Sequence, residues 1–507
     1  MSKQASSNLG GYGACGIARI GALLALTLAV AGTAQAQTAA PAPAPAPAPA
    51  KAEDSSLTWK GITLYGIVDI GVQYDTHSAP FSDYFPATSG SLLQKNGYDS
   101  PVGLTSNNLS QSRIGLSGNE PLFGDWAGVF RLETFFNPSS GDLSDALKSV
   151  TLNNGKALTT QTVGVDSSVA GQLFGGAAYF GLASATIGSF TFGRNVTLVA
   201  DGISKYDPMG AAQAFSVIGY SGTAAGGGDT EDRRLDQSIK YIAKYGPIHL
   251  GALYEFGSYS GSTNTGYQIQ LGAEFAGFSV DAWYFKKYDA VSVSALSNIA
   301  VTDVINNCNA DVASVTATNP PPPGGKTTPS TVRCYSLSNS VAGTVSDNKT
   351  YMVSALWNLS PVPLKLYAGY EHIAFDNPVD PLEPGTVIIG GYVLATTNNK
   401  AYDNERTLQI YWGGVKWNLT PDLELTAAYY GYKQNSFATG KNAGCTDTRN
   451  SGCSGNLHAA SAVIDYRLSK RFDFYFGPFW NEVTNGLANG YYAKNNIATT
   501  LGARFKF

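Results

Sequence analysis

Residues 61–75 read GITLYGIVDIGVQYD, and apolar and polar side chains alternate along this stretch. One face would carry apolar or aromatic side chains, namely Ile62, Leu64, Val68, Ile70, Val72 and Tyr74. The other face would carry Thr63, Tyr65, Asp69 and Gln73. Because successive side chains of a β-strand point to opposite faces, the pattern predicts a strand with one apolar and one polar face.

The same alternation returns several times along the chain. It is clearest in ERTLQIYWGGVKWNL (405–419), DLELTAAYYGYKQN (422–435) and NIATTLGARFKF (496–507). Each segment has the ten or more residues that a tilted strand needs to cross a membrane. The abundance of Tyr, Phe and Gly also favours strands and turns over helices. The sequence therefore predicts an all-β fold.

The connections between these segments alternate between short and long. Short ones are expected near 121–125, 186–188, 246–247, 276–277, 360–363, 420–422 and 469–470. Long polar loops are expected near 76–107, 137–176, 196–232, 257–266, 289–347, 376–404, 436–456 and 483–495. We therefore predict a 16-stranded antiparallel transmembrane β-barrel with short periplasmic turns and long extracellular loops.

A soluble sandwich would bury the apolar face of its strands, and sixteen such strands would leave an oversized core. A transmembrane barrel turns that face to lipid and lines its interior with the polar one. Aromatic residues near strand ends fit the girdles of such a barrel, although ordinary packing explains each one equally well. They are Trp357, Tyr411, Trp412, Trp417, Tyr429, Tyr430, Phe479 and Trp480.

The N-terminal part predicts secretion. A sparse basic region, the apolar run Ile20–Val30 and the small-residue motif Ala34–Ala36 have the layout of a signal peptide. We expect a signal peptide at 1–36, a Pro/Ala-rich linker at 37–60 and the barrel at 61–507. The mature chain would then hold 31 basic and 37 acidic side chains, which gives no indication of nucleic-acid binding.

Four cysteines remain after such cleavage. Three connectivities are possible, and we favour Cys308 with Cys334 and Cys445 with Cys453 because each pair shares one polar, Gly- and Ser-rich stretch. Free thiols in the loops are the alternative. The spacing of the cysteines does not match a zinc site, and we expect neither a metal nor a cofactor.

At this point the chain resembles the general porins of Gram-negative bacteria, particularly the trimeric 16-stranded group of Neisseria and Burkholderia. The resemblance extends from about Leu64 to Phe507. It rests on LYGIVDIGV (64–72), SRIGLSGNEPLFGDWAGVFRLE (112–133), YFGLASATIGSFTFGRN (179–195), RLDQSIKY (234–241) and the terminal Phe507. It implies an outer-membrane homotrimer, in contact with lipid and lipopolysaccharide, through which small hydrophilic solutes and ions diffuse.

The resemblance also implies a pore constriction, formed where the third long loop (196–232) folds into the lumen. The arginines of the facing wall would be Arg113, Arg194 and Arg234, and the loop acids Asp201 and Asp207. Alternation turns Arg113 inward because Ile114 and Leu116 share the apolar parity, and Arg234 inward because Leu235 and Ile239 do the same. Arg194 shares the apolar face of Phe192 unless the strand ends or bulges there.

Two further wall residues, Arg131 and Glu133, have inward parity but could simply pair with each other. Asp201 and Asp207 could alternatively be ordinary loop acids in contact with solvent, with no role in a constriction.

Other functions remain open on sequence grounds. A substrate-selective channel would use aromatic loop residues such as Tyr206, Phe215 and Tyr220, which could equally pack the loop against the wall. A non-conducting adhesin or a barrel enzyme is a third class. None of the four histidines lies in a recognisable catalytic motif, so we expect no enzyme.

Overall fold

The chain divides into two units, Met1–Ser56 and Leu57–Phe507, in the computed structural model. The structure describes residues 57–78, 81, 100–141, 143, 173–218, 233–257, 265–295, 341–379, 387–389, 392–394, 396–440, 452–488 and 493–507. The predicted signal peptide lies outside these residues, as does the predicted linker up to Ser56.

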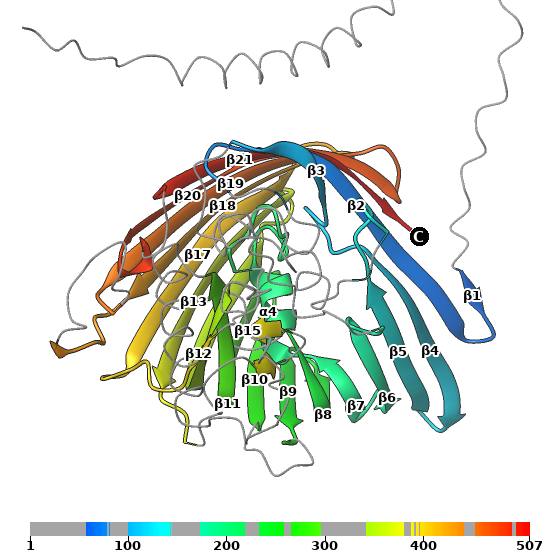
Figure 1. The fold of residues 1–507 in the computed structure, drawn as a ribbon. Coiled ribbons are helices and arrows are strands. Elements are labelled where there is room, and N and C mark those ends of the chain that lie inside the picture. The colour runs from blue at the N-terminus through cyan, green and yellow to red at the C-terminus, as the bar shows by residue number, and fades with distance from the viewer. Residues whose placement is uncertain are drawn as a thin grey trace, which may run out of the picture. The chain divides into compact units, whose positions relative to one another are not determined.

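Sixteen long strands form one closed antiparallel barrel, which confirms the predicted fold (Figure 1). They are β2 (Ile62–Asp75), β4 (Arg113–Phe123), β5 (Trp126–Phe135), β6 (Ala177–Ser184), β7 (Gly188–Val196), β8 (Arg234–Tyr245), β9 (Ile248–Glu255), β10 (Gly266–Phe275), β11 (Phe278–Ala295), β12 (Val341–Asn358), β13 (Leu364–Asp376), β17 (Arg406–Asn418), β18 (Leu423–Gln434), β19 (Gly455–Arg467), β20 (Phe472–Asn485) and β21 (Asn495–Lys506). The last strand pairs with the first, with Asp69 opposite Arg504. This closure leaves the sheet without an unpaired edge in lipid.

Shorter elements accompany the barrel. They are β1 (Thr58–Trp59), β3 (Val102–Ser106), the small strands β14 (Val387–Ile389), β15 (Tyr392–Leu394) and β16 (Thr396–Asn398), the helix α4 (Leu198–Tyr206) and the 3-10 turn η3 (Gly486–Ala488). β1 pairs with β2 and lies inside the range 37–60 that was expected to be linker. β3 also pairs with β2, although 76–107 was expected to be loop. Within the described part of the chain, no helix is long and apolar enough to cross a membrane.

The tight turns fall where the sequence places them. Ala276 and Gly277 both adopt positive φ, 48° and 79°, which matches the twist of the hairpin that joins β10 to β11. The expected loop 289–347 was wrong at both edges. β11 continues past a register shift between Lys287 and Ala290 and ends only at Ala295, and β12 already begins at Val341. A bulge with positive φ at Asp289 interrupts the alternation there, so the strand resembled a loop.

The two faces of the barrel follow the predicted alternation. Ile62 and Leu64 are exposed on the outer face, whereas Asp69 and Gln73 are buried on the inner one. Among the aromatic residues, Trp357, Tyr411, Trp417 and Tyr429 are exposed on the outside. Trp412, Tyr430 and Phe479 are instead buried inside the barrel, so the girdle expectation was wrong for these three.

Cys453 is disulfide-bonded. Cys308, Cys334 and Cys445 lie outside the described residues. The two favoured pairings therefore stay predictions.

Candidate functional site

One side of the lumen carries a compact charged cluster on β2, β4 and β5. The buried Glu133 carboxylate lies at its centre and accepts hydrogen bonds from Arg131 Nη2 at 2.5 Å and from Tyr65 OH at 3.0 Å. Arg113 Nη1 lies 3.8 Å from the same oxygen. Arg131 Nε also donates to Tyr65 OH at 2.7 Å. The structure thus brings Arg113, Arg131 and Glu133 together, with both guanidinium groups partly exposed above a buried carboxylate.

Glu133→Gln is expected to increase anion permeation and to destabilise the barrel by about 2 kcal/mol, because it leaves two arginines without their shared counter-charge. Reversal potentials in a salt gradient and urea unfolding measure the two effects. Glu274→Gln is the control, since the exposed Glu274 side chain lies 3.7 Å from a single lysine, Lys244, rather than beneath two arginines. Equal behaviour of the two variants would contradict this role for Glu133.

Arg194 is placed by an irregularity in β7. The β7–β8 register shifts between Gly193 and Asn195, and Gly193 has a φ of 128°. This is the bulge that an inward arginine requires at this point of the strand. Arg194 Nη1 binds Asp236 Oδ1 at 2.7 Å and its Nε donates to the Gly175 carbonyl at 3.1 Å.

Arg234 lies close to Arg194, since the two side chains bind the carbonyls of Gly175 and Gly176, but strand alternation does not explain its position. The parity argument assumed that Leu235 and Ile239 face outward together, but Leu235 is buried in the interior cluster. The register shift lies between them, and Gln237 adopts a φ of 47°. The Arg234 guanidinium nevertheless lies 4.5 Å from the centre of the Phe135 ring and donates to the Gly176 carbonyl at 2.7 Å.

The described part of the third long loop lies inside the barrel, where α4 packs against β9–β13 (Figure 1). Thr197 caps the helix by accepting a hydrogen bond from Ala200 N. Asp201, in the first turn, is largely exposed and its carboxylate lies 2.5 Å from Lys240 Nζ on β8. Gly202 permits close packing, since a methyl group there would approach Trp283 Cζ2 to 2.5 Å.

Asp207 has a different environment from the one expected for a constriction acid. It is buried, and its carboxylate accepts hydrogen bonds from Tyr430 OH at 2.6 Å, Met209 N at 3.1 Å and Ala211 N at 2.9 Å. The side chain therefore faces the wall and fixes the loop. The sequence could not reveal this, because the partner Tyr430 lies on a distant strand.

Burial raises the pKa of the Asp207 carboxyl above its ordinary value, an effect that its hydrogen bonds reduce without cancelling. The folded chain therefore keeps this proton in a pH range where the unfolded chain has lost it. Stability from this group rises as the pH falls from the raised pKa toward the ordinary value of about 4. Asp207→Asn should remove that part of the pH dependence, measured by urea unfolding at a series of pH values. Identical slopes for both proteins would contradict the assignment.

The aromatic residues of the loop pack rather than face the lumen. Tyr206 and Phe215 are both fully buried, and Tyr220 lies outside the described residues. Phe215 meets Tyr475 edge-on, with 6.2 Å between the ring centres. Trp412 Nε1 donates to the Tyr206 carbonyl at 3.0 Å. An aromatic track formed by Tyr206 and Phe215 is therefore excluded in this arrangement.

Sequence reasoning missed the carboxylate that anchors the end of α4. Asp281 is fully buried on β11 and binds Tyr206 OH and Lys205 Nζ through Oδ2. Its Oδ1 accepts from Gln270 Nε2 at 3.0 Å and lies 2.9 Å from His249 Nδ1. The inward parity of Asp281 was available from the sequence, but its four partners were not. No group of three or more His, Cys, Asp or Glu among the described residues could hold a metal ion.

Comparison with known proteins identifies the family. The sequence model of the Gram-negative porins matches residues 22–478. The chain belongs to the Gram-negative porin family. With its closed barrel of sixteen strands, this porin resides in the outer membrane.

The individual relatives of this porin share only a small part of its sequence. An outer membrane porin of Bordetella pertussis is 28% identical over 196 residues, which cover 38% of the chain and only 42% of that relative. An anion-selective porin from Comamonas acidovorans has a similar structure, with a TM-score of 0.53, 16% identity, and coverage of 88% of this chain and 99% of that one. OmpT of Vibrio cholerae has a TM-score of 0.49 at 12% identity, covering 89% and 100%. The Comamonas structure supports the fold.

Proposed function

We propose that this porin forms a water-filled channel for passive diffusion of small hydrophilic solutes and ions. The observation that carries the proposal is a closed barrel whose inner face is charged and which encloses the described part of the third long loop. Arg113, Arg131, Arg194 and Arg234 lie on one side, and Asp201 projects from α4 beside Lys240. Such a polar passage admits hydrated solutes and opposes apolar ones.

Liposome swelling tests this function directly. Liposomes that contain the purified mature porin should swell in iso-osmotic arabinose faster than in a larger sugar such as raffinose, since passage through a water-filled pore depends on size. Protein-free liposomes give the baseline. Swelling equal to that baseline, with the barrel verified as folded, would contradict the proposal.

A homotrimer embedded in lipid and lipopolysaccharide is part of the same proposal and rests on family membership. The exposed apolar outer face supports contact with lipid, as Leu271, Phe474 and Leu501 exemplify. Native mass spectrometry in detergent would report three subunits. A monomer that conducts alone would contradict the trimer without affecting the channel function.

The processing of the chain belongs to the proposal as well. We expect cleavage after Ala36 and a mature N-terminus at Gln37, which intact mass measurement of the outer-membrane protein determines. Peptide mapping without reduction would test the pairs Cys308–Cys334 and Cys445–Cys453. We further propose a transport role without catalysis, because no residue pattern in the chain indicates a reaction.

A further inference from the structure

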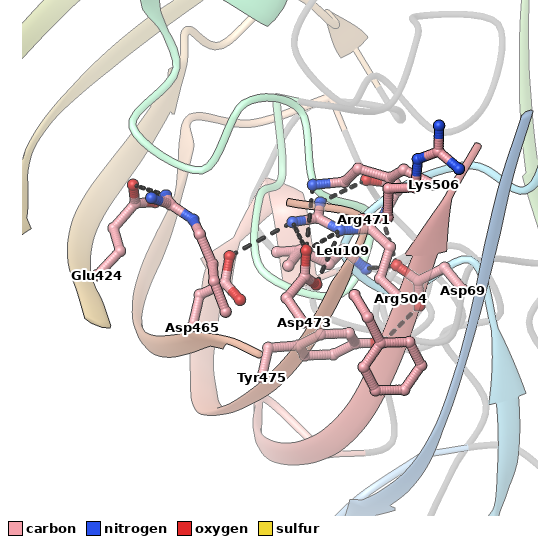
Figure 2. Close-up of polar contacts among 12 residues, drawn as sticks. Asp69, Leu109, Glu424, Asp465, Arg471, Asp473, Tyr475, Arg504 and Lys506 are labelled. Atoms are coloured by element: carbon pink, nitrogen blue, oxygen red, sulfur yellow. Dashed lines mark hydrogen bonds and ion pairs between the residues drawn. The ribbon is translucent and has the colours of Figure 1, made fainter. Parts of the chain in front are cut away.

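A second charged cluster lines the lumen on β17–β21 (Figure 2). The arginines described above lie elsewhere on the wall, on β4, β5, β7 and β8. Its side chains alternate with the exposed outer residues Tyr466, Phe474 and Phe505, so they point inward. They lie close to the short turns that follow β17 and β19. The cluster therefore belongs to the periplasmic end of the pore.

Ion pairs join neighbouring strands across this cluster. Arg504 binds Asp473 at 3.0 Å and Asp465 at 3.3 Å, as Figure 2 shows, and Lys506 Nζ lies 3.1 Å from Asp473. Farther along the wall, Glu424 pairs with two cations of the adjacent strands. These are Lys416 at 3.1 Å and Arg467 at 2.6 Å.

The two signs of charge differ in exposure. The acids Glu424, Asp465 and Asp473 have side chains that are only 4% to 11% exposed. The basic side chains are 12% to 40% exposed and comprise Lys416, Arg467, Arg504 and Lys506. The carboxylates therefore lie beneath the cations, and the wall presents mainly N–H donors to the lumen. We call these four cations the basic shelf.

Within the basic shelf, Arg504 is held in place by contacts with the segment between β3 and β4. Arg504 Nη1 donates to Ser110 Oγ at 2.7 Å, and the backbone N–H groups of Leu109 and Ser110 donate to Asp69 Oδ2 at 2.9 and 2.7 Å. Tyr475 OH donates to the other oxygen of Asp69 at 2.5 Å. Because these contacts fix Arg504 before any solute arrives, little ordering accompanies contact with an anion.

We propose that the basic shelf is a second contact site for multivalent anions, at the periplasmic end of the pore. This inference rests on the proposed channel function and adds a second anion-binding position along the pore. An anion with several carboxylate or phosphate oxygens can bridge two cations of the shelf, and charge-assisted hydrogen bonds favour such contacts over those of chloride. Arg467 and Lys506 should contribute most, because they are the most exposed of the four.

Citrate block of the channel tests the proposal. Arg467→Gln/Lys506→Gln keeps a partner for each acid, since Glu424 retains Lys416 and Asp473 retains Arg504. With full-length mature porin in a planar bilayer, citrate added on the periplasmic side should block chloride current about fivefold more weakly than in the wild type, because two nearby charges are lost. The charge-conserving Arg467→Lys/Lys506→Arg should retain the block.

The matched control is Lys349→Gln/Lys433→Gln, which removes two exposed cations of the outer face and should leave the block unchanged. Unchanged citrate block in the shelf variant, in a channel that conducts, would overturn the second site and leave the channel function intact. A silent wild-type protein would instead contradict the channel function. If the double variant does not fold, Lys506→Gln alone should still weaken the block, and wild-type affinity there would overturn the proposal.

Discussion

Replacing Arg113, Arg194 and Arg234 together with alanine is expected to lower the anion-to-cation permeability ratio of the pore about tenfold. The three guanidinium groups lie along the inner wall of β4, β7 and β8, and each contributes about 0.5 kcal/mol to an anion nearby in screened water. Reversal potentials measured in a salt gradient report the ratio. The effect should weaken in high salt, since ions screen exposed charges.

The control for this prediction is a variant with the same loss of charge away from the lumen. Lys349, Lys433 and Lys470 are exposed, on the outer face or at a short turn, and their replacement with alanine should leave the reversal potential within error. An unchanged reversal potential in the arginine variant would contradict the proposed role of these residues in ion selectivity. The barrel would remain, since its fold does not depend on that role.

Trp412→Ala is expected to destabilise the docked third loop by about 3–5 kcal/mol, the usual cost of removing a buried tryptophan. The indole packs in the interior cluster and donates to the Tyr206 carbonyl at the end of α4. A loop that is less firmly held should broaden the distribution of single-channel conductances. Unfolding in urea and single-channel recording measure the two consequences.

Trp417→Ala is the matched control, because Trp417 lies on the same strand but on the exposed outer face. It should change neither the interior packing nor the conductance distribution. If Trp412→Ala and Trp417→Ala behave alike in both measurements, the loop is not held by the contact that we describe.

The strands were predictable from the sequence because a membrane barrel imposes one rule along its length. Every strand must turn apolar side chains to lipid and polar ones to water, so alternation alone places Ile62 outside and Asp69 inside. The short turns followed from residues such as Ala276–Gly277, which adopt the backbone that a tight hairpin requires.

Alternation failed where the backbone departs from it. The bulge opposite Gly193 puts Leu235 inside the barrel. The expectation that Leu235 faces outward, from which Arg234 was placed on the inner wall, was therefore wrong. Trp412 and Tyr430 resembled girdle residues because the sequence does not reveal that a loop fills part of the lumen and packs on them. These contacts join positions about two hundred residues apart, which no local pattern encodes.

The charged cluster around Glu133 was partly predictable for a similar reason. Arg113, Arg131 and Glu133 lie on adjacent strands in register, so inward parity was enough to bring them together. The position of Asp207 was not predictable, since its burial depends on how the loop folds back on β18. Residues on strands were thus easier to place than residues on the loop between them.

Single-channel recording of the purified mature porin in a planar bilayer tests the central claim most directly. We predict stepwise conductance that closes in groups of three, together with a non-zero reversal potential in a salt gradient. No conductance from protein whose barrel is verified as folded would contradict the account, because the proposed water-filled channel must pass ions.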